Sequence, residues 1–339
     1  MTLAIKENVS LKDYTTLKTG GVGLYLVEVG SVEELGQAVD LAKQHQLPVL
    51  VIGEGSNFLI SDEGFSGLVI KVNILGRDYV EDGETVTFTC GAGETLDKIV
   101  AETVTKGYWG LENLSAIPGT VGATPVQNVG AYGVEIKDVV KTVETFHLLT
   151  KEKKVFTNHE CRFGYRDSFF KTDEGRNYVI TKVSFVLSKN AKPKIDYADL
   201  QKFFSGSEIS LEKIRQAIIS IRANKFPDWK VVGTAGSFFK NPIVDKVVVD
   251  SILLRYPDLP VYQVDENSFK IPLGFVLDKI CNLKGYRVGQ VGLYENQALV
   301  LVNYGENNAT EIKNFVTEIT KIVAEKTGIK IEPEVRFVF

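Results

Sequence analysis

The fold of this chain is indicated most clearly by the stretch Ile117-Pro118-Gly119-Thr120-Val121-Gly122-Ala123-Thr124-Pro125-Val126-Gln127-Asn128-Val129-Gly130-Ala131-Tyr132-Gly133, called the glycine window below. Its four glycines and two alanines leave many backbone N–H groups without a bulky side chain beside them. Such a backbone can wrap a pyrophosphate with main-chain donors and can approach a flat ring closely. A series of tight turns that needs positive φ angles explains the composition equally well. Gln127 and Asn128 favour ligand contact, because buried amides need hydrogen-bond partners.

A second glycine-rich turn, Gly53-Glu54-Gly55-Ser56-Asn57, directly follows an apolar run at 48–52 that is typical of a buried strand. A strand that ends in a glycine turn lets the backbone approach a phosphate group. The sequence contains neither the G-x-G-x-x-G dinucleotide fingerprint nor a Gly-Lys-Ser/Thr phosphate loop. We therefore expect no ordinary Rossmann turn.

The composition is that of a globular protein of two domains. The chain has 339 residues, 44% of them hydrophobic and 24% charged, which argues against disorder. A net charge of -4 gives no basic stripe for a nucleic-acid backbone. The three cysteines are far apart and lack CxxC spacing, so we expect neither disulfides nor a metal site. A protein of this kind fits a reducing cytoplasm. No apolar segment has the features expected of a signal peptide or of a membrane span.

Helix and strand signals are mixed along the chain, and they predict an α+β protein. A strand at 24–29, a helix capped by Ser31, a strand at 48–52 and short β runs between Leu68 and Leu187 form the first domain, with one helix at 96–106. Polar residues at 190–194 and the Ser205-Gly206-Ser207 tract indicate a boundary. The last third carries helices at 211–223 and 275–283, a strand at 298–303 and an amphipathic helix. The apolar face of that helix consists of Ile312, Phe315, Val316, Ile319, Ile322 and Val323.

Several motifs, in this order along nearly the whole chain, closely resemble those of the UDP-N-acetylenolpyruvoylglucosamine reductase family. The motifs are Gly53 to Asn57, Ile117 to Ala123, Gln127 to Gly133, Phe163-Gly164-Tyr165-Arg166-Asp167-Ser168, Ala235-Gly236-Ser237-Phe238-Phe239-Lys240-Asn241-Pro242 and Glu332-Pro333-Glu334-Val335-Arg336. One such segment alone would be weak evidence, but their common order is specific.

The resemblance implies a two-lobed FAD-binding domain of the p-cresol methylhydroxylase/vanillyl-alcohol oxidase type at 15–190, split near 72, and an α+β substrate-binding domain at 205–339. In that family the two glycine segments hold FAD. The cofactor-binding residues implied here are Gly53, Glu54, Gly55, Ser56, Asn57, Ile117, Pro118, Gly119, Thr120, Gly122, Ala123, Gln127, Asn128, Gly130, Ala131, Tyr132 and Gly133.

The implied reaction is the NADPH-dependent reduction of an enolpyruvyl ether, UDP-N-acetylenolpyruvoylglucosamine, to UDP-N-acetylmuramate in peptidoglycan precursor synthesis, with hydride from reduced FAD. Arg166 suits the substrate carboxylate, since a guanidinium pairs bidentately with it, although an ion pair with Asp167 or another acid is an alternative. Ser237 resembles the family's proton donor, and without the resemblance it would be a turn residue or a helix cap. Glu334 matches a glutamate that assists enolate stabilisation or protonation, and would otherwise belong to a solvated edge.

The resemblance also implies substrate contacts. Lys225 matches a diphosphate-binding lysine, Asn241 and Gln297 match two amide contacts, and Tyr197 matches a tyrosine on a loop that closes over the substrate in the first of two subtypes. Tyr165, beside Arg166, completes this set. We expect a monomer that binds no nucleic acid and no membrane. Two alternatives remain at this stage: another FAD-linked oxidase of the same fold, and a non-catalytic nucleotide-sugar binding protein.

Overall fold

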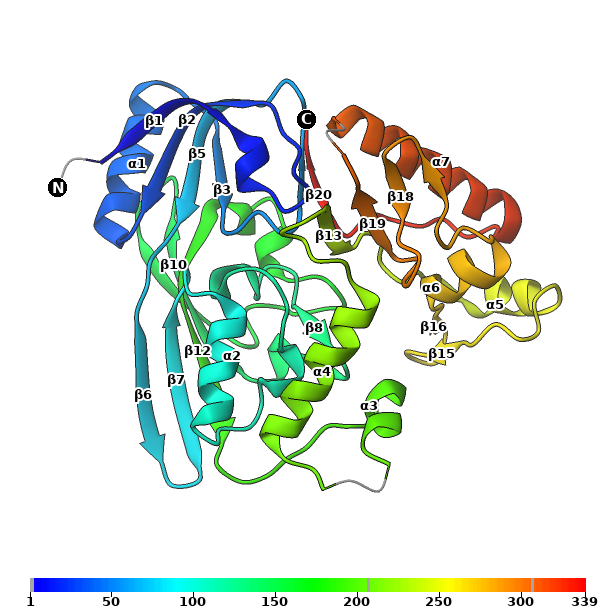
Figure 1. Cartoon of the computed structure of the whole chain (residues 1–339). Coiled ribbons are helices and arrows are strands. Elements are labelled where there is room, and N and C mark those ends of the chain that lie inside the picture. The colour runs from blue at the N-terminus through cyan, green and yellow to red at the C-terminus, as the bar shows by residue number, and fades with distance from the viewer. Residues whose placement is uncertain (1–2, 206–207, 306–307) are drawn as a thin grey trace. The chain divides into compact units, whose positions relative to one another are not determined.

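The computed structural model describes residues 3–205, 208–305 and 308–339, and its contacts divide the chain into two compact units (Figure 1). The first unit contains the residues up to Val9, then Gly23–Glu54 and Ser66–Arg222. The second contains Ser10–Val22, Gly55–Phe65 and Ala223–Phe339. The tract at 205–207, where a boundary was expected, lies outside the described residues at Gly206 and Ser207.

The first unit begins with a four-stranded sheet covered by helix α1 (Val32–Gln44). Its strands, in sheet order, are β1 (Ile5–Ser10), β2 (Val22–Val29), β5 (Phe65–Val72) and β3 (Val49–Ile52). Strands β3 and β5 pair in parallel, from Val49 opposite Leu68 to Ile52 opposite Lys71. Ser31 caps α1 as expected, because its side chain accepts a hydrogen bond from the N–H of Glu34.

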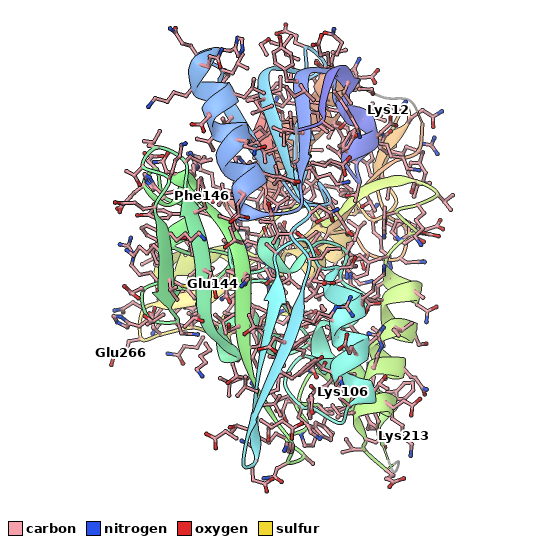
Figure 2. All side chains as sticks on the ribbon, turned by 90° about the vertical axis from the view of Figure 1, so that its left-hand side faces the viewer. Lys12, Lys106, Glu144, Phe146, Lys213 and Glu266 are labelled. Carbon is pink, nitrogen blue, oxygen red and sulfur yellow. The ribbon has the colours of Figure 1, made fainter. Side chains whose placement is uncertain are left out.

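A second, antiparallel sheet follows after Val72. Its strands, in sheet order, are β11 (Lys153–Thr157), β10 (Val140–His147), β12 (Tyr178–Ser188), β7 (Thr85–Gly91) and β6 (Arg77–Asp82). Both sheets contribute to one hydrophobic cluster that includes Val27, Leu68, Phe88 and Val183. Figure 2 shows Phe146, near the end of β10, beside α1, where its ring lies 3.8 Å from the place of a Cβ on Gly36.

The connections of the first unit carry helices α2 (Leu96–Thr105), α3 (Ala198–Phe203) and α4 (Leu211–Lys225), together with the short hairpin β8 (Gly130–Ala131) and β9 (Val134–Glu135). Helices α2 and α4 lie side by side in Figure 1, and the Arg215 guanidinium of α4 donates 2.6 Å and 3.0 Å hydrogen bonds to both carboxylate oxygens of Asp97 on α2. The short 3-10 turns here are η2 (Glu112–Leu114), η3 (Val121–Ala123), η4 (Ile136–Asp138), η5 (Phe169–Lys171) and η6 (Gly175–Asn177).

The second unit is built on a four-stranded antiparallel sheet against which helix α7 (Ala309–Thr327) packs (Figure 1). Its strands, in order, are β13 (Gly233–Ser237), β19 (Val300–Asn303), β18 (Val291–Leu293) and β17 (Arg287–Val288). The expected apolar face of α7 is confirmed, since Ile312, Phe315 and Val316 are buried and Asn308 caps the helix. The unit also contains η1 (Leu11–Tyr14), α5 (Lys246–Leu253) and a three-stranded sheet of β14 (Ile243–Asp245), β16 (Ser268–Lys270) and β15 (Tyr262–Gln263).

One expected helix differs in type. Residues 275–283 are not an α-helix: a short α6 (Leu273–Phe275) continues into a π-helical turn, Val276–Ile280. The N–H of Cys281 bonds to the carbonyl of Val276 and that of Leu283 to Leu277, and Asn282 has a φ of 57°. The wider turn lets Val276, Leu277, Cys281 and Leu283 all enter the core, which an apolar pattern alone does not distinguish from α-helix.

The unit boundaries differ from the expected ranges of 15–190 and 205–339, for two reasons. Residues near the N-terminus belong to the second unit because their backbone is bonded there: Thr234 N–H bonds to the carbonyl of Thr16, and β4 (Phe58–Ile60) pairs in parallel with β20 (Arg336–Val338). Helix α4 belongs to the first unit as far as Arg222, because Arg215 on it contacts Asp97. No helix among the described residues is long and apolar enough to cross a membrane.

Candidate functional site

The end of the glycine window is a tight two-residue hairpin. Gly130 pairs with Glu135 and Ala131 with Val134, so Tyr132 and Gly133 form the turn with φ angles of 51° and 82°. Two consecutive positive φ angles are what the twist of a two-residue hairpin requires, and Gly133 meets this at no steric cost. The turn places the ring of Tyr132 in a buried cluster with Leu200, Phe204 and Ile214. Burial raises the pKa of Tyr132 to about 12.

Several N–H groups of the window are already bonded within the protein. Gly119 N–H donates to Glu54 Oε2 at 2.9 Å, Gly122 N–H to the carbonyl of Ala92 at 2.9 Å, and Ala123 N–H to the carbonyl of Thr120 at 3.0 Å. The expectation that these groups are open to a phosphate is therefore wrong for these residues. The Ala123 donor is used within the 3-10 turn η3, and the other two are used by Glu54 and Ala92, so the tight-turn interpretation holds for this part.

The two glycine segments touch each other in the first unit. A Cβ on Gly53 would lie 2.4 Å from Thr120 Oγ1, and a Cβ on Gly122 would lie 2.6 Å from the Cβ of Ala92. These glycines are thus required by the close approach of neighbouring chain segments. Gly55 is in the second unit, where a Cβ would lie 1.9 Å from the carbonyl oxygen of Tyr14. Ser56 is half-buried beside it.

Asn128 ties the window to the motif that contains Arg166. Its Nδ2 donates to Glu135 Oε2 and to the carbonyl of Gly164, both at 2.9 Å, and its Oδ1 accepts the N–H of Lys137. The residue is fully buried with a φ of 46°. Its side chain is committed to the protein, so any contact of Asn128 with a cofactor comes from its backbone. Gln127 is half-buried.

Arg166 occupies the tip of a turn closed by reciprocal hydrogen bonds between Gly164 and Asp167. Its φ of 52° is in the left-handed region, which is costly for a residue with a Cβ and therefore marks a constrained position. The guanidinium donates a 3.0 Å hydrogen bond to the carbonyl of Gly130 and lies 5.7 Å from the ring of Tyr165. The structure thus brings the expected carboxylate-binding arginine onto the hairpin of the glycine window.

Arg222, near the end of α4, contacts the residue before the window and the hairpin at its far end. Its Nε donates a 3.1 Å hydrogen bond to the carbonyl of Ala116, whose φ is 58°, and its side chain also bonds to Tyr132. Loss of hydration lowers the pKa of Arg222 from its ordinary value, yet an arginine remains charged. The N–H of Ala116 donates to Asp97 Oδ1 at 2.6 Å. Both backbone groups of Ala116 are therefore fixed by ionised side chains.

Ser237 and Glu334 lie on adjacent extended segments of the second unit. Strand β13 has a register shift between Thr234 and Ser237, where Gly236 has a φ of 74°; such bulges turn a side chain in a new direction. Beyond Ser237, Phe239 pairs with Pro333, and Glu334 N–H donates to the carbonyl of Phe238 at 2.7 Å. Ser237 and Glu334 are both half-buried, one residue out of register with each other.

The expected amide contacts also meet in the second unit. Asn241 Oδ1 accepts the N–H of Leu273 at 2.9 Å, and the Oε1 of Gln297 lies 3.2 Å from the place of a Cβ on Gly274. Both side chains therefore face the first turn of α6. Lys225 is the half-buried last residue of α4. In the first unit, the ring of Tyr197, 45% exposed, lies edge-on to Tyr132 with centroids 5.3 Å apart.

The sequence reasoning missed Asn113, Arg222 and Asp97 as residues that shape the window. Asn113 is fully buried, and its Nδ2 donates to the carbonyls of Tyr132 and Lys194. A polar residue between Leu111 and Leu114 was the available signal, because a buried amide needs partners. No comparable signal exists for Arg222, since an arginine late in a helix is usually solvated. Among the described residues, no group of three His, Cys, Asp or Glu side chains could hold a metal ion.

Comparison with known proteins agrees with both units. The model of an FAD binding domain matches residues 24–156, and that of the UDP-N-acetylenolpyruvoylglucosamine reductase C-terminal domain matches 227–338. A UDP-N-acetylenolpyruvoylglucosamine reductase from Flavobacterium johnsoniae is 40% identical over 99% of this chain and 100% of its own length. Another, from Chromobacterium violaceum, is 38% identical over 98% of this chain and 99% of its own length. This chain belongs to the UDP-N-acetylenolpyruvoylglucosamine reductase family.

The family is also evident in three dimensions. The crystal structure of the Thermus caldophilus UDP-N-acetylenolpyruvylglucosamine reductase superposes with a TM-score of 0.70 at 27% identity, covering 100% of both chains. The expected FAD-binding domain followed by a second α+β domain is thereby confirmed.

The residues of the first unit fit FAD in size and in charge. Gly119 and Ala123 carry little side-chain bulk, so the backbone there can lie against a planar ring system, whereas Gly122 packs against Ala92. Arg222 is a poorly hydrated cation beside the window, and Arg166 is a second cation on the hairpin. A dinucleotide with an anionic diphosphate matches both features.

Proposed function

We propose that this protein is the FAD-dependent enzyme that reduces UDP-N-acetylenolpyruvoylglucosamine to UDP-N-acetylmuramate with NADPH, a step of peptidoglycan precursor synthesis. Membership of the reductase family over 99% of the chain supports this activity. The C-terminal domain match at 227–338 favours it over another FAD-linked oxidase, since that domain is described by the reductase's name. When bound, FAD supplies the two electrons, which it has received from NADPH. The protein's own side chains bind the substrate and supply the proton.

Arg166 holds the carboxylate of the enolpyruvyl group in this proposal. A guanidinium stays charged and offers a planar fork, which suits a carboxylate whose charge grows during the reduction. Its hydrogen bond to the Gly130 carbonyl and its left-handed backbone fix the position of the side chain before substrate arrives. Preorganised charge of this kind stabilises a transition state without a reorganisation cost.

Ser237 delivers the proton, and Glu334 stabilises the developing enolate or assists protonation. A hydroxyl is a weak acid in water, so its effectiveness depends on placement next to the carbon that accepts the proton. The bulge before Ser237 and the hydrogen bond from Glu334 N–H to Phe238 fix the backbone at both residues, which supports this assignment. The pairing of these two motifs is the observation that carries the proposal.

Five further residues are assigned to substrate binding. Lys225 binds the diphosphate as a point charge, and Asn241 and Gln297 offer amide contacts next to α6. Tyr165 flanks Arg166, and Tyr197 belongs to a segment that closes over the substrate, which places the enzyme in the first subtype of the family. Glycine-window residues, including Gly130 to Gly133, and the segment Gly53 to Asn57 contact FAD.

We further propose a cytoplasmic monomer, in line with three buried cysteines that form no disulfide.

The proposal is tested by stopped-flow spectroscopy of the purified protein. We expect flavin absorbance, its loss on addition of NADPH, and its return on anaerobic addition of the enolpyruvyl nucleotide sugar. Because NADPH and the substrate would use one pocket in turn, initial-rate plots should be parallel. A colourless protein would contradict both enzyme interpretations, and a reduced flavin that the nucleotide sugar does not reoxidise would contradict this one.

A further inference from the structure

Residues 191–196, all of them described, form neither helix nor strand, although they lead directly to Tyr197. The segment is mostly exposed, with only Ile195 partly buried against the cluster around Tyr132. Segments without a hydrogen-bond ladder of their own depend on individual contacts for their position. The contacts of this stretch, called the Tyr197 segment (191–197), therefore determine where Tyr197 lies.

One buried amide supplies the central contact. Asn113 Nδ2 donates 2.8 Å hydrogen bonds to the carbonyl of Lys194 and to the carbonyl of Tyr132. Asn113 has no exposed surface, and its Oδ1 has no partner among the described residues. Since the two hydrogens of one amide group are fixed relative to each other, the two carbonyls are held in a fixed relation. Tyr132 belongs to the hairpin turn of the glycine window, and Lys194 belongs to the Tyr197 segment.

A second contact joins the same two elements. The ring of Tyr197 lies edge-on to the ring of Tyr132, with centroids 5.3 Å apart, an arrangement that aromatic pairs favour. An ion pair of 3.3 Å between Lys194 Nζ and Asp138 also contacts the segment, but its lysine side chain is 51% exposed and the pair contributes little. The backbone of the window and the Tyr197 segment are thus coupled through Asn113 and Tyr132.

We propose that Asn113 is a positioning residue that couples the glycine window to the Tyr197 segment, so that the cofactor loop and the substrate-closing tyrosine hold one arrangement. The inference rests on the proposed function for its kinetic consequence. Removing the amide leaves two carbonyls without their donor and frees the segment at Lys194. Removing the amide slows the step that uses the nucleotide sugar, because Tyr197, which acts in that step, is no longer held in position.

Asn158 provides a matched control. Its Nδ2 also donates to two backbone carbonyls at 2.8 Å, those of Lys137 and Val140, but it lies in the turn after β11 and outside the cluster of Tyr132. Asn113→Ala and Asn158→Ala therefore each remove an amide with two carbonyl partners. Only the first removes a contact of the Tyr197 segment.

The first measurement is hydrogen exchange on the FAD-loaded enzyme without substrate. We expect Asn113→Ala to raise the exchange rate of the Leu200 and Gln201 amides, which donate to the carbonyl of Tyr197, by about tenfold, as the loss of a hydrogen bond worth about 1.5 kcal/mol implies, and Asn158→Ala to leave it unchanged. Unchanged exchange in Asn113→Ala would overturn the proposal. If the alanine variant does not fold, Asn113→Ser, which keeps a single donor, is used in the same comparison.

The second measurement is a double-mutant cycle on kcat/KM for the nucleotide sugar, with Tyr197→Ala as the second change. We expect Asn113→Ala to cost about tenfold in the wild-type background and little in the Tyr197→Ala background. A residue that only supports the fold would give equal, additive losses in both backgrounds. If the wild-type enzyme does not turn over the nucleotide sugar, the proposed function fails, and hydrogen exchange still decides the coupling.

Discussion

The backbone N–H of Glu334 donates a 2.7 Å hydrogen bond to the carbonyl of Phe238, the residue after Ser237. A further bond joins this segment to an earlier one: Asn57 Nδ2 donates to the carbonyl of Glu334 at 3.2 Å. Residues far apart in the sequence, from three of the resembling motifs, therefore share one hydrogen-bonded assembly in the second unit.

Ser237→Ala and Glu334→Gln should each slow reoxidation of the reduced flavin by the nucleotide sugar on the order of a hundredfold, because each removes a positioned proton-transfer group. Flavin reduction by NADPH should keep its rate, since neither group acts in it. Stopped-flow absorbance separates the two half-reactions. Ser251→Ala, at an exposed site of α5, and Glu332→Gln, with a carboxylate 77% exposed, serve as controls. Normal reoxidation in Ser237→Ala would make the proton-donor assignment wrong.

Arg222→Lys should weaken FAD binding by about tenfold or more, because a lysine keeps the charge but loses the Nε donor to Ala116 and the planar fork. The dissociation constant is measured from flavin fluorescence on titrating the apoprotein. Arg176→Lys is the control, since Arg176 is 57% exposed and pairs with Asp173 on the surface. Equal FAD affinity in the wild type and Arg222→Lys would show that FAD binding does not depend on the hydrogen bond from Arg222 to Ala116.

Local patterns were sufficient for much of the fold. The cap at Ser31 and the apolar face of α7 each depend on residues close together in the sequence. The assignment of the chain near Leu17 and Phe58 to the second unit depends instead on distant partners such as Asn303 and Arg336. Such pairing leaves no periodicity in the segment itself, so a sequence pattern cannot predict it.

Site residues that belong to a sequence motif could be predicted, and the contacts that hold them in place could not. Arg166 and Ser237 could be named from their motifs, but the partners that fix them could not. The glycines of the window were interpreted as gaps for a ligand, yet Gly53 and Gly122 are required by Thr120 and Ala92. Composition does not distinguish these two causes, because a ligand and a neighbouring segment both exclude a Cβ.

Gly53→Ala tests the second cause directly. Its Cβ would lie 2.4 Å from Thr120 Oγ1, and Thr120 is buried, so overpacking should cost about 1–3 kcal/mol of unfolding free energy. Thr120→Ala removes the clashing atom, and the double variant should regain most of the loss. Thermal unfolding of the four proteins measures this. Gly36→Ala, on α1 with its nearest neighbour at 3.8 Å, should be neutral or stabilising. A double variant as unstable as Gly53→Ala would mean that another contact requires the glycine.

The ion pair between Asp97 and Arg215 should make stability depend on pH in the acid range. Burial acts to raise the pKa of Asp97, but hydrogen bonds from Arg215 and the Ala116 N–H, with the charge of Arg215, outweigh it and hold the pKa below its ordinary value. A depressed pKa in the folded state gives stability that is full above the unfolded value, about 3.9, and is lost as pH falls through the folded value.

Asp97→Asn should therefore lower the free energy of unfolding at pH 7 by about 1–2 kcal/mol, an amount that allows for the partial exposure of this pair. The deficit should shrink as the pH falls below about 4, because the wild type then loses its own carboxylate charge. Urea unfolding followed by circular dichroism between pH 7 and 3 measures the difference. Asp40→Asn is the control, since Asp40 forms a surface pair with Lys151 and is 59% exposed. A deficit of constant size across this range would show that Asp97 acts by packing and not through its charge.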